Sequence, residues 1–157
     1  MSLLSWSLAG AASIHIIEEF AFPGGFKAWW CAYKPDIAAS VSNRFLIIIN
    51  GILIAFSVIV ALAVSAPKGN GVAAWLTLAA LLFSNAIFHI IGAIQTKRYS
   101  PGMISGIVLY IPLAIYGFAH FLRSGQASMR TALLAFAIGG SYHLVSFANH
   151  RRRAQAA

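Results

Sequence analysis

Five long apolar runs constrain this chain more than any other feature of its sequence. Of the 157 residues, 60% are hydrophobic and only 9% are charged, which is not the composition of a soluble domain. A helix needs roughly 20 apolar residues to cross a bilayer. We therefore predict a single all-α domain, 1–157, that is an integral membrane bundle of about five transmembrane helices. The predicted helices are 3–22, 45–66, 72–95, 103–122 and 131–149.

The segment 23–42 is the one long connection between these runs. It mixes aromatic and basic side chains, among them Trp29, Trp30 and Lys34. Such a mixture is typical of the headgroup layer of a membrane. We expect the segment to be interfacial or to fold over a site, with the tryptophan pair in the interface.

The basic residues predict an orientation, since they flank the apolar runs. With five crossings, the segment 23–42, the loop 96–102 and the C-terminus share one side. That side holds Lys27, Lys34, Arg44, Lys97, Arg98, Arg151, Arg152 and Arg153, whereas the other side holds Lys68, Arg123 and Arg130. The positive-inside rule then predicts a cytoplasmic C-terminus and an outer N-terminus in a bacterial inner membrane. No nucleic-acid partner is expected, and the first run, which lacks a basic leader, is expected to be retained.

Four predicted helices bring a polar side chain to one depth. His15, Asn50, His89 and His143 each lie six or seven residues from the cytoplasmic end of their run. At 1.5 Å per residue this is roughly 10 Å below the boundary. His120 lies near the opposite end, so we leave it out of the site.

Helical phase places the polar residues on shared faces. His15, Glu18 and Glu19 are spaced i, i+3 and i+4, and Asn85 and His89 are spaced i and i+4. Ionisable groups among lipid tails cost several kcal/mol unless they find partners. We therefore expect these faces to point into the bundle.

This mixture of carboxylates and imidazoles predicts a divalent metal site. The metal would neutralise the carboxylates and accept the neutral imidazoles. Zinc or iron fits such a ligand set, and manganese is also compatible. The predicted ligands are His15, Glu18, Glu19, His89 and His143.

Three other interpretations stay open. A buried glutamate beside a neutral histidine could serve as a metal-free acid–base pair in an isomerase or cyclase. A small-molecule or ion transporter would need polar residues through the whole depth, whereas the outer halves of the runs are almost uniformly apolar. In a purely structural protein, Glu18 or Glu19 would pair with Arg44 or Lys27, and the histidines would be ordinary core residues.

Several short motifs occur together along most of the chain. They are His15-Ile16-Ile17-Glu18-Glu19, Phe22-Pro23, Asn85 with His89, and Tyr99-Ser100-Pro101-Gly102. In combination they resemble the HXXEE-motif family of small bacterial membrane proteins, whose function is poorly defined. The resemblance implies a polytopic membrane protein and an enzyme with no known substrate. It carries over His15, Glu18, Glu19, Asn85, His89, Tyr99 and Pro101 as candidate positions.

The predicted function is that of a metal-dependent hydrolase or oxidoreductase at a cytoplasm-facing site. Its partners would be membrane lipid and a lipophilic or amphipathic small molecule.

The turn 99–102 also has a plain structural role, because Pro-Gly between helices makes a tight turn. The catalytic candidates are Glu18, Glu19 and Tyr99, and the candidates for substrate contact or for support of the metal ligands are Asn50, Asn85, Lys97 and Arg98.

Overall fold

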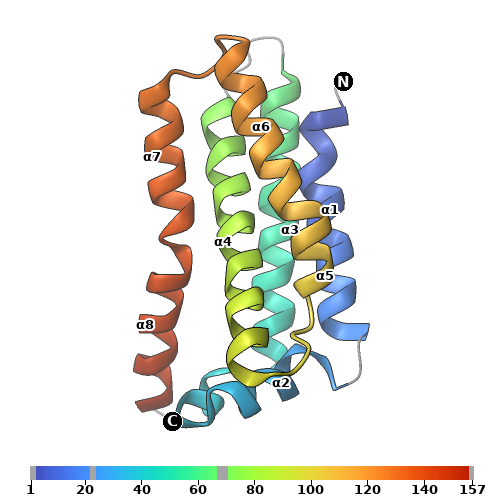
Figure 1. Cartoon of the computed structure of the whole chain (residues 1–157), viewed down its shortest axis with the longest axis vertical. Helices are drawn as coiled ribbons and strands as arrows, with labels where there is room; N and C mark the ends of the chain where they lie inside the picture. Colours follow the sequence, from blue (N-terminus) through green and yellow to red (C-terminus); the bar gives the residue numbers. More distant parts are fainter. Residues whose placement is uncertain (1–2, 22–23, 67–70, 156–157) are drawn as a thin grey trace.

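A computed structural model describes residues 3–21, 24–66 and 71–155 of the chain. These residues form helices and connecting turns, without a strand, and the long helices run along the long axis of the molecule (Figure 1). The helices are α1 (Leu3–Ala21), α2 (Gly25–Tyr33), η1 (Pro35–Ser40), α3 (Asn43–Ser65), α4 (Val72–Thr96), α5 (Met103–Ser105), the π-helical turn η2 (Gly106–Tyr110), α6 (Ile111–Arg123), α7 (Met129–Gly140) and α8 (Tyr142–Gln155). Phe22, Pro23 and Lys68, which entered the sequence predictions, lie outside the described residues.

Four helical segments of the described chain are long and apolar enough to cross a membrane. They are Asn43–Ser65, Val72–Thr96, Met103–Arg123 and Met129–Gln155. The predicted all-α bundle is confirmed, and its count of five spans is approximate, because α1 runs beside these segments but is not one of the four (Figure 1).

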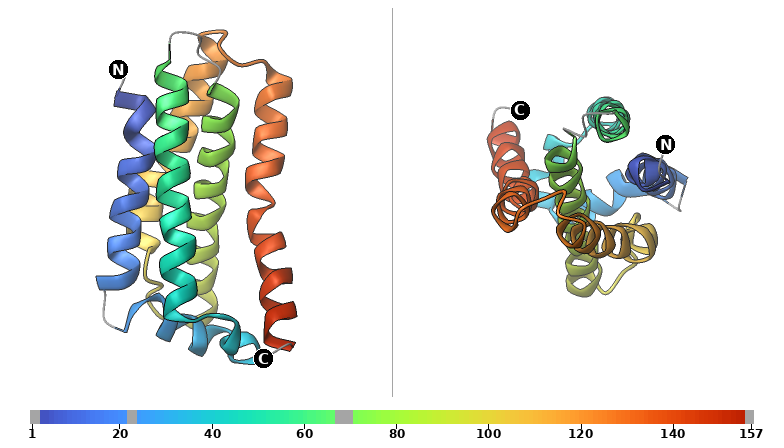
Figure 2. Two further views of the ribbon diagram at one scale, coloured as in Figure 1. Left: turned by 180° about the vertical axis from the view of Figure 1, so that it is seen from behind. Right: turned by 90° about the horizontal axis from the view of Figure 1, so that it is seen from above.

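Helix α4 lies at the centre of the bundle and packs against α1, α3, α6 and α7 (Figure 2). Two glycines let its neighbours approach closely. A Cβ on Gly117 of α6 would lie 2.1 Å from the Trp75 ring, and a Cβ on Gly139 of α7 would lie 2.2 Å from the Thr77 carbonyl oxygen. Trp75 is fully buried. Small residues therefore set how tightly the helices close on α4.

Two predicted helices are interrupted where their sequence weakens the backbone hydrogen bonding of the helix. The predicted helix 131–149 is divided between α7 and α8 at Ser141, directly after Gly139-Gly140. The predicted helix 103–122 contains the wide turn η2, which ends two residues before Pro112. Glycine and serine pairs and π-turns are ordinary causes of helix breaks, and proline cannot donate the next backbone hydrogen bond.

The segment after α1 folds back across one end of the bundle. Helices α2 and η1 lie across the end that also holds the C-terminus (Figure 2). Trp29 and Trp30 are only 8% and 4% exposed, so their rings pack inside the protein and do not form an exposed aromatic surface. The reason is close packing: a Cβ on Gly92 would lie 2.5 Å from the Trp29 ring, so the absence of a side chain there makes room for it.

The glycine pair in α7 allows a matched test of this packing. Gly139→Ala should lower the free energy of unfolding by about 1–3 kcal/mol, because the new methyl meets backbone atoms of α4 that cannot move aside. Gly140→Ala is the control, since nothing lies within 4 Å of its Cβ position. Thermal unfolding in detergent should show a lower Tm for Gly139→Ala alone, and equal Tm values would contradict the packing.

Candidate metal centre

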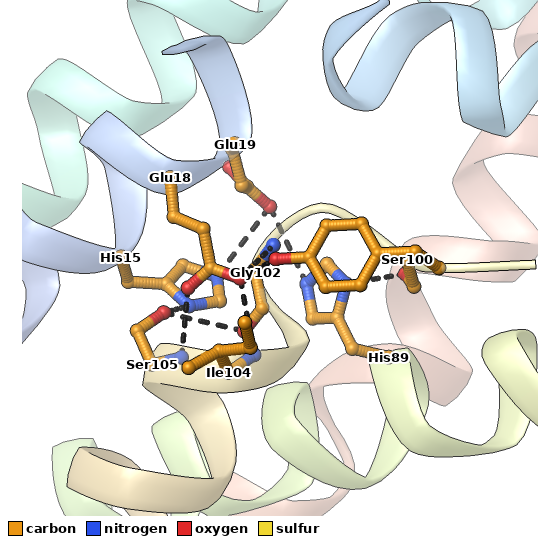
Figure 3. Close-up of polar contacts among 9 residues, drawn as sticks. His15, Glu18, Glu19, His89, Ser100, Gly102, Ile104 and Ser105 are labelled. Atoms are coloured by element: carbon orange, nitrogen blue, oxygen red, sulfur yellow. Dashed lines mark hydrogen bonds and ion pairs between the residues drawn. The ribbon is translucent and has the colours of Figure 1, made fainter. Parts of the chain in front are cut away.

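Three donor atoms converge where α1 meets the lower half of α4 (Figure 3). The Glu19 Oε1 atom lies 3.5 Å from His15 Nε2 and 3.4 Å from His89 Nε2. All three donor atoms lie within 4.8 Å of one another. His15, Glu19 and His89 are buried, with His89 completely inaccessible. The i, i+4 spacing in α1 presents His15 and Glu19 to the same point on α4.

Each imidazole forms a hydrogen bond to a serine hydroxyl through Nδ1, the ring nitrogen other than the one that faces Glu19. His15 Nδ1 lies 2.9 Å from Ser105 Oγ, and His89 Nδ1 lies 2.9 Å from Ser100 Oγ. The Gly102 carbonyl oxygen lies 3.3 Å from the Ser105 hydroxyl, and when the hydroxyl donates to it, the hydroxyl oxygen accepts from His15 Nδ1–H. A neutral His15 then turns an unprotonated Nε2 toward Glu19.

The Nε2 atoms of His15 and His89 have no hydrogen-bond partner among the described residues. A nitrogen lone pair that faces a carboxylate oxygen is repelled unless a cation or a proton lies between them. Metal-binding histidines typically have this arrangement, in which Nδ1 is held by a polar group and Nε2 is left for the ion. The donor set therefore fits a divalent metal.

Glu18 has a different environment from Glu19. Its carboxylate accepts hydrogen bonds from the backbone N–H groups of Gly102 and Ile104, both at 3.0 Å, and of Ser105, at 2.7 Å. These are donors that the start of α5 leaves without helical partners. Glu18, in α1, thus caps the N-terminus of α5. The sequence predicted Glu18 as a metal ligand together with Glu19, but the three converging donors include Glu19 and not Glu18.

Tyr99 donates its hydroxyl to Glu18. Burial raises the pKa of the Tyr99 phenol, and the neighbouring Glu18 carboxylate raises it further. The phenol is therefore protonated at neutral pH and acts as a donor. This contact places Tyr99 against the capping carboxylate, whereas the sequence predicted a catalytic role.

Gly102 lies directly beside both imidazoles. Its φ of +100° is in the left-handed region, which favours glycine. A Cβ at this position would lie 2.6 Å from His15 Cε1 and 3.0 Å from His89 Cε1. The turn between α4 and α5 thus serves as a wall of the site, in addition to the tight turn predicted from Pro101-Gly102.

A cavity of about 450 Å³ adjoins this centre. His15 and Glu19 line one end of it, and α3, α4 and α8 supply most of the other walls. Phe26 and Trp30 of α2 also line it, so the folded-back segment covers the lower side.

The other predicted site residues are divided between the cavity and the surface. Asn50, Asn85 and His143 line the cavity. The His143 ring stacks on Phe88 at 4.9 Å and is not a member of the three-donor group. Lys97 and Arg98 are exposed on the turn after α4 and do not line the cavity.

Three buried residues near the centre were absent from the predicted site: Ser100, Ser105 and Tyr110. The Tyr110 ring centroid lies 4.6 Å from that of His15, and its hydroxyl has no hydrogen-bond partner within the described part of the chain. Its position depends on the wide turn η2, for which Pro112 was the available sequence signal. Ser100 belongs to the Tyr99-Ser100-Pro101-Gly102 motif but was not singled out within it, and Ser105, in α5, had no comparable signal.

Comparison with known proteins gives one match. A family model described as "Protein of unknown function with HXXEE motif" matches residues 6–117. The matched region contains the three converging donors, the capping glutamate and the turn, and it ends before His143. No curated protein and no solved structure matches the chain.

The two adjacent glutamates should respond differently to substitution. Glu18→Ala should lower the free energy of unfolding by about 2–4 kcal/mol, because several buried N–H groups lose a charged acceptor. Glu19→Gln keeps the shape of its side chain and can donate to one imidazole, so it should change stability by less than about 1 kcal/mol. Thermal unfolding of the metal-free protein in detergent, with a chelator present, measures both. A larger loss for Glu19→Gln would contradict the separate roles.

Proposed function

The chain belongs to the family of proteins of unknown function with the HXXEE motif, and from the geometry of its site we propose that it is a membrane-embedded, metal-dependent enzyme acting on a lipophilic or amphipathic molecule. One observation carries the proposal: two imidazole Nε2 atoms and one carboxylate oxygen converge within 4.8 Å in a buried site. That site borders a cavity large enough for a small molecule.

Two histidines and one carboxylate form a ligand set with open coordination positions. Zinc sites of this composition keep a position for water, and the same set holds iron in oxygen-using enzymes. Manganese also accepts these ligands. A bound metal would activate water or polarise a substrate oxygen. The chemistry supported best is therefore hydrolysis or oxidation of the substrate.

In this proposal the residues of the HXXEE motif have two roles: His15 and Glu19 bind the metal, and Glu18 binds the turn beside it. His15 and Glu19 act as metal ligands together with His89. Glu18 secures the turn that carries Ser100, Gly102 and Ser105, and these residues surround the two imidazoles. The motif therefore supplies two ligands and the anchor of the loop that orients the ligand set.

The proposed setting is a membrane with the metal centre near the cytoplasmic face. The four candidate spans expose large apolar side chains, including Ile47, Ile59, Leu133 and Ile138, each more than half exposed. The described basic residues concentrate at the end that holds α2 and the C-terminus, whereas the opposite end holds Arg123 and Arg130. The positive-inside rule then favours a cytoplasmic site.

A metal-free acid–base enzyme is the second candidate. The Glu19 oxygen lies within 3.5 Å of both Nε2 atoms, so a proton could be shared there without a metal. Glu19 would then exchange protons with an imidazole during an isomerisation or cyclisation. Metal content separates this candidate from the first.

Metal analysis of the detergent-purified protein is the direct test. The wild-type protein should contain or take up a stoichiometric zinc, iron or manganese ion, and Glu19→Ala and His89→Ala should each lose it. His120→Ala is the matched control, because His120 stacks on Tyr116 at the opposite end of the bundle. A folded wild-type protein that neither contains nor takes up metal would refute the metal proposal and favour acid–base catalysis.

The serines behind the imidazoles give an independent test. Ser100→Ala and Ser105→Ala should each weaken metal binding by about 10–100-fold, because the hydroxyls orient the ligating rings. Ser13→Ala is the control, since its hydroxyl donates to the Ala9 carbonyl oxygen of its own helix. Competition with a chelator of known affinity measures the change. Unaltered affinity in both site variants would show that the serines do not support metal ligands.

A further inference from the structure

We infer that the cavity binds a single-chain amphipath whose polar end is an uncharged hydroxyl or carbonyl group, with its tail directed toward the middle of the bilayer. This inference rests on the proposed function and names its substrate class. The cavity has an apolar part and a polar part at different depths, and its side wall opens between two helices.

The apolar part of the cavity lies away from the metal centre along the bundle axis. Leu53 and Phe56 of α3 and Leu81 and Leu82 of α4 line it. Leu82 precedes His89 by seven residues, which is roughly 10 Å along a helix. This part of the wall is apolar and lies toward the middle of the candidate spans, where an acyl tail would lie in a membrane.

The polar part has buried hydrogen-bonding atoms that lack a partner among residues 3–21, 24–66 and 71–155. These are the Tyr110 hydroxyl, Asn85 Oδ1 and His143 Nε2, and all three residues line the cavity. Unpaired buried polar atoms cost roughly 1–3 kcal/mol each, so a ligand that satisfies them would bind favourably. Tyr110 also packs against His15, which brings its hydroxyl near the metal centre.

The charge of the lining favours an uncharged polar end. Tyr110 and Asn85 carry no charge at neutral pH and offer both donors and acceptors. The cationic Lys34 lies at the lower rim, where its ammonium group is 4.2 Å from the centre of the Tyr33 ring. The Glu19 carboxylate is already assigned to the metal. A hydroxyl or carbonyl group matches this set without a buried countercharge.

The side of the cavity opens between α3 and α8. These helices lie on either side of α4 (Figure 2), and the lining residues Ile52, Phe56 and Leu144 are also exposed, by 58%, 42% and 77%. In a membrane this opening faces lipid tails, so a ligand would enter sideways from the bilayer. The volume of about 450 Å³ is near the lower end of the usual range for small-molecule pockets, roughly 300–1,000 Å³, and suits one chain.

Photocrosslinking in nanodiscs tests this assignment. The probe is a long-chain fatty alcohol with a diazirine in the middle of its chain, and mass spectrometry locates the labelled residues. We expect labels at Leu53, Leu81 and Leu82, and competition by unlabelled fatty alcohol but not by added phosphatidylcholine. Labels confined to the outer faces of the bundle, or equal competition by the phospholipid, would overturn the inference.

A matched pair of variants tests the cavity itself. Leu53→Trp should fill it and reduce labelling severalfold, while the metal content stays at the wild-type level. Ile59→Trp is the control, because Ile59 is 61% exposed on the same helix and lies outside the cavity lining. Equal labelling in the two variants with metal retained would refute the amphipath site and leave the metal centre standing. Labelling at the cavity in a wild-type protein without metal would instead refute the proposed function alone.

Discussion

The arrangement of the site depends on the Glu18 carboxylate. Glu18 extends from α1 to the backbone of a turn more than 80 residues later and accepts three of its N–H groups. These bonds hold the start of α5 against α1. The turn in turn places Ser105 behind His15 and Ser100 behind His89. Hydrogen bonds made by Glu18, which contacts neither imidazole through them, therefore help to determine how both imidazoles are directed.

Charge balance explains how two adjacent buried acids are accommodated in the bundle. The Glu18 carboxylate is stabilised by several hydrogen bonds. The Glu19 carboxylate faces two imidazoles, which carry no compensating positive charge in their neutral form. Isolated carboxylates are costly in a low-dielectric interior. The two carboxylates together carry the charge that one divalent cation neutralises, so a metal at the three donors would remove most of this cost.

Much of the fold follows from the sequence, because apolar runs of spanning length leave few alternatives. Depth and helical phase also placed His15, Glu19 and His89 near one another. The separate environments of Glu18 and Glu19 could not be predicted, since both lie on the same face of α1 and a distant turn distinguishes them. The burial of Trp29 depends on space beside Gly92, and the position of Tyr110 depends on the π-turn. Such features arise from packing between distant segments.

The position of Gly102 links the two histidines mechanically. Its backbone lies against both imidazoles, and the serines that hold the two rings lie within three residues of it. The two histidines therefore share one mechanical support, although they come from different helices. A displacement of this turn would therefore remove the serine contacts of both rings at once and change the orientation of both imidazoles together.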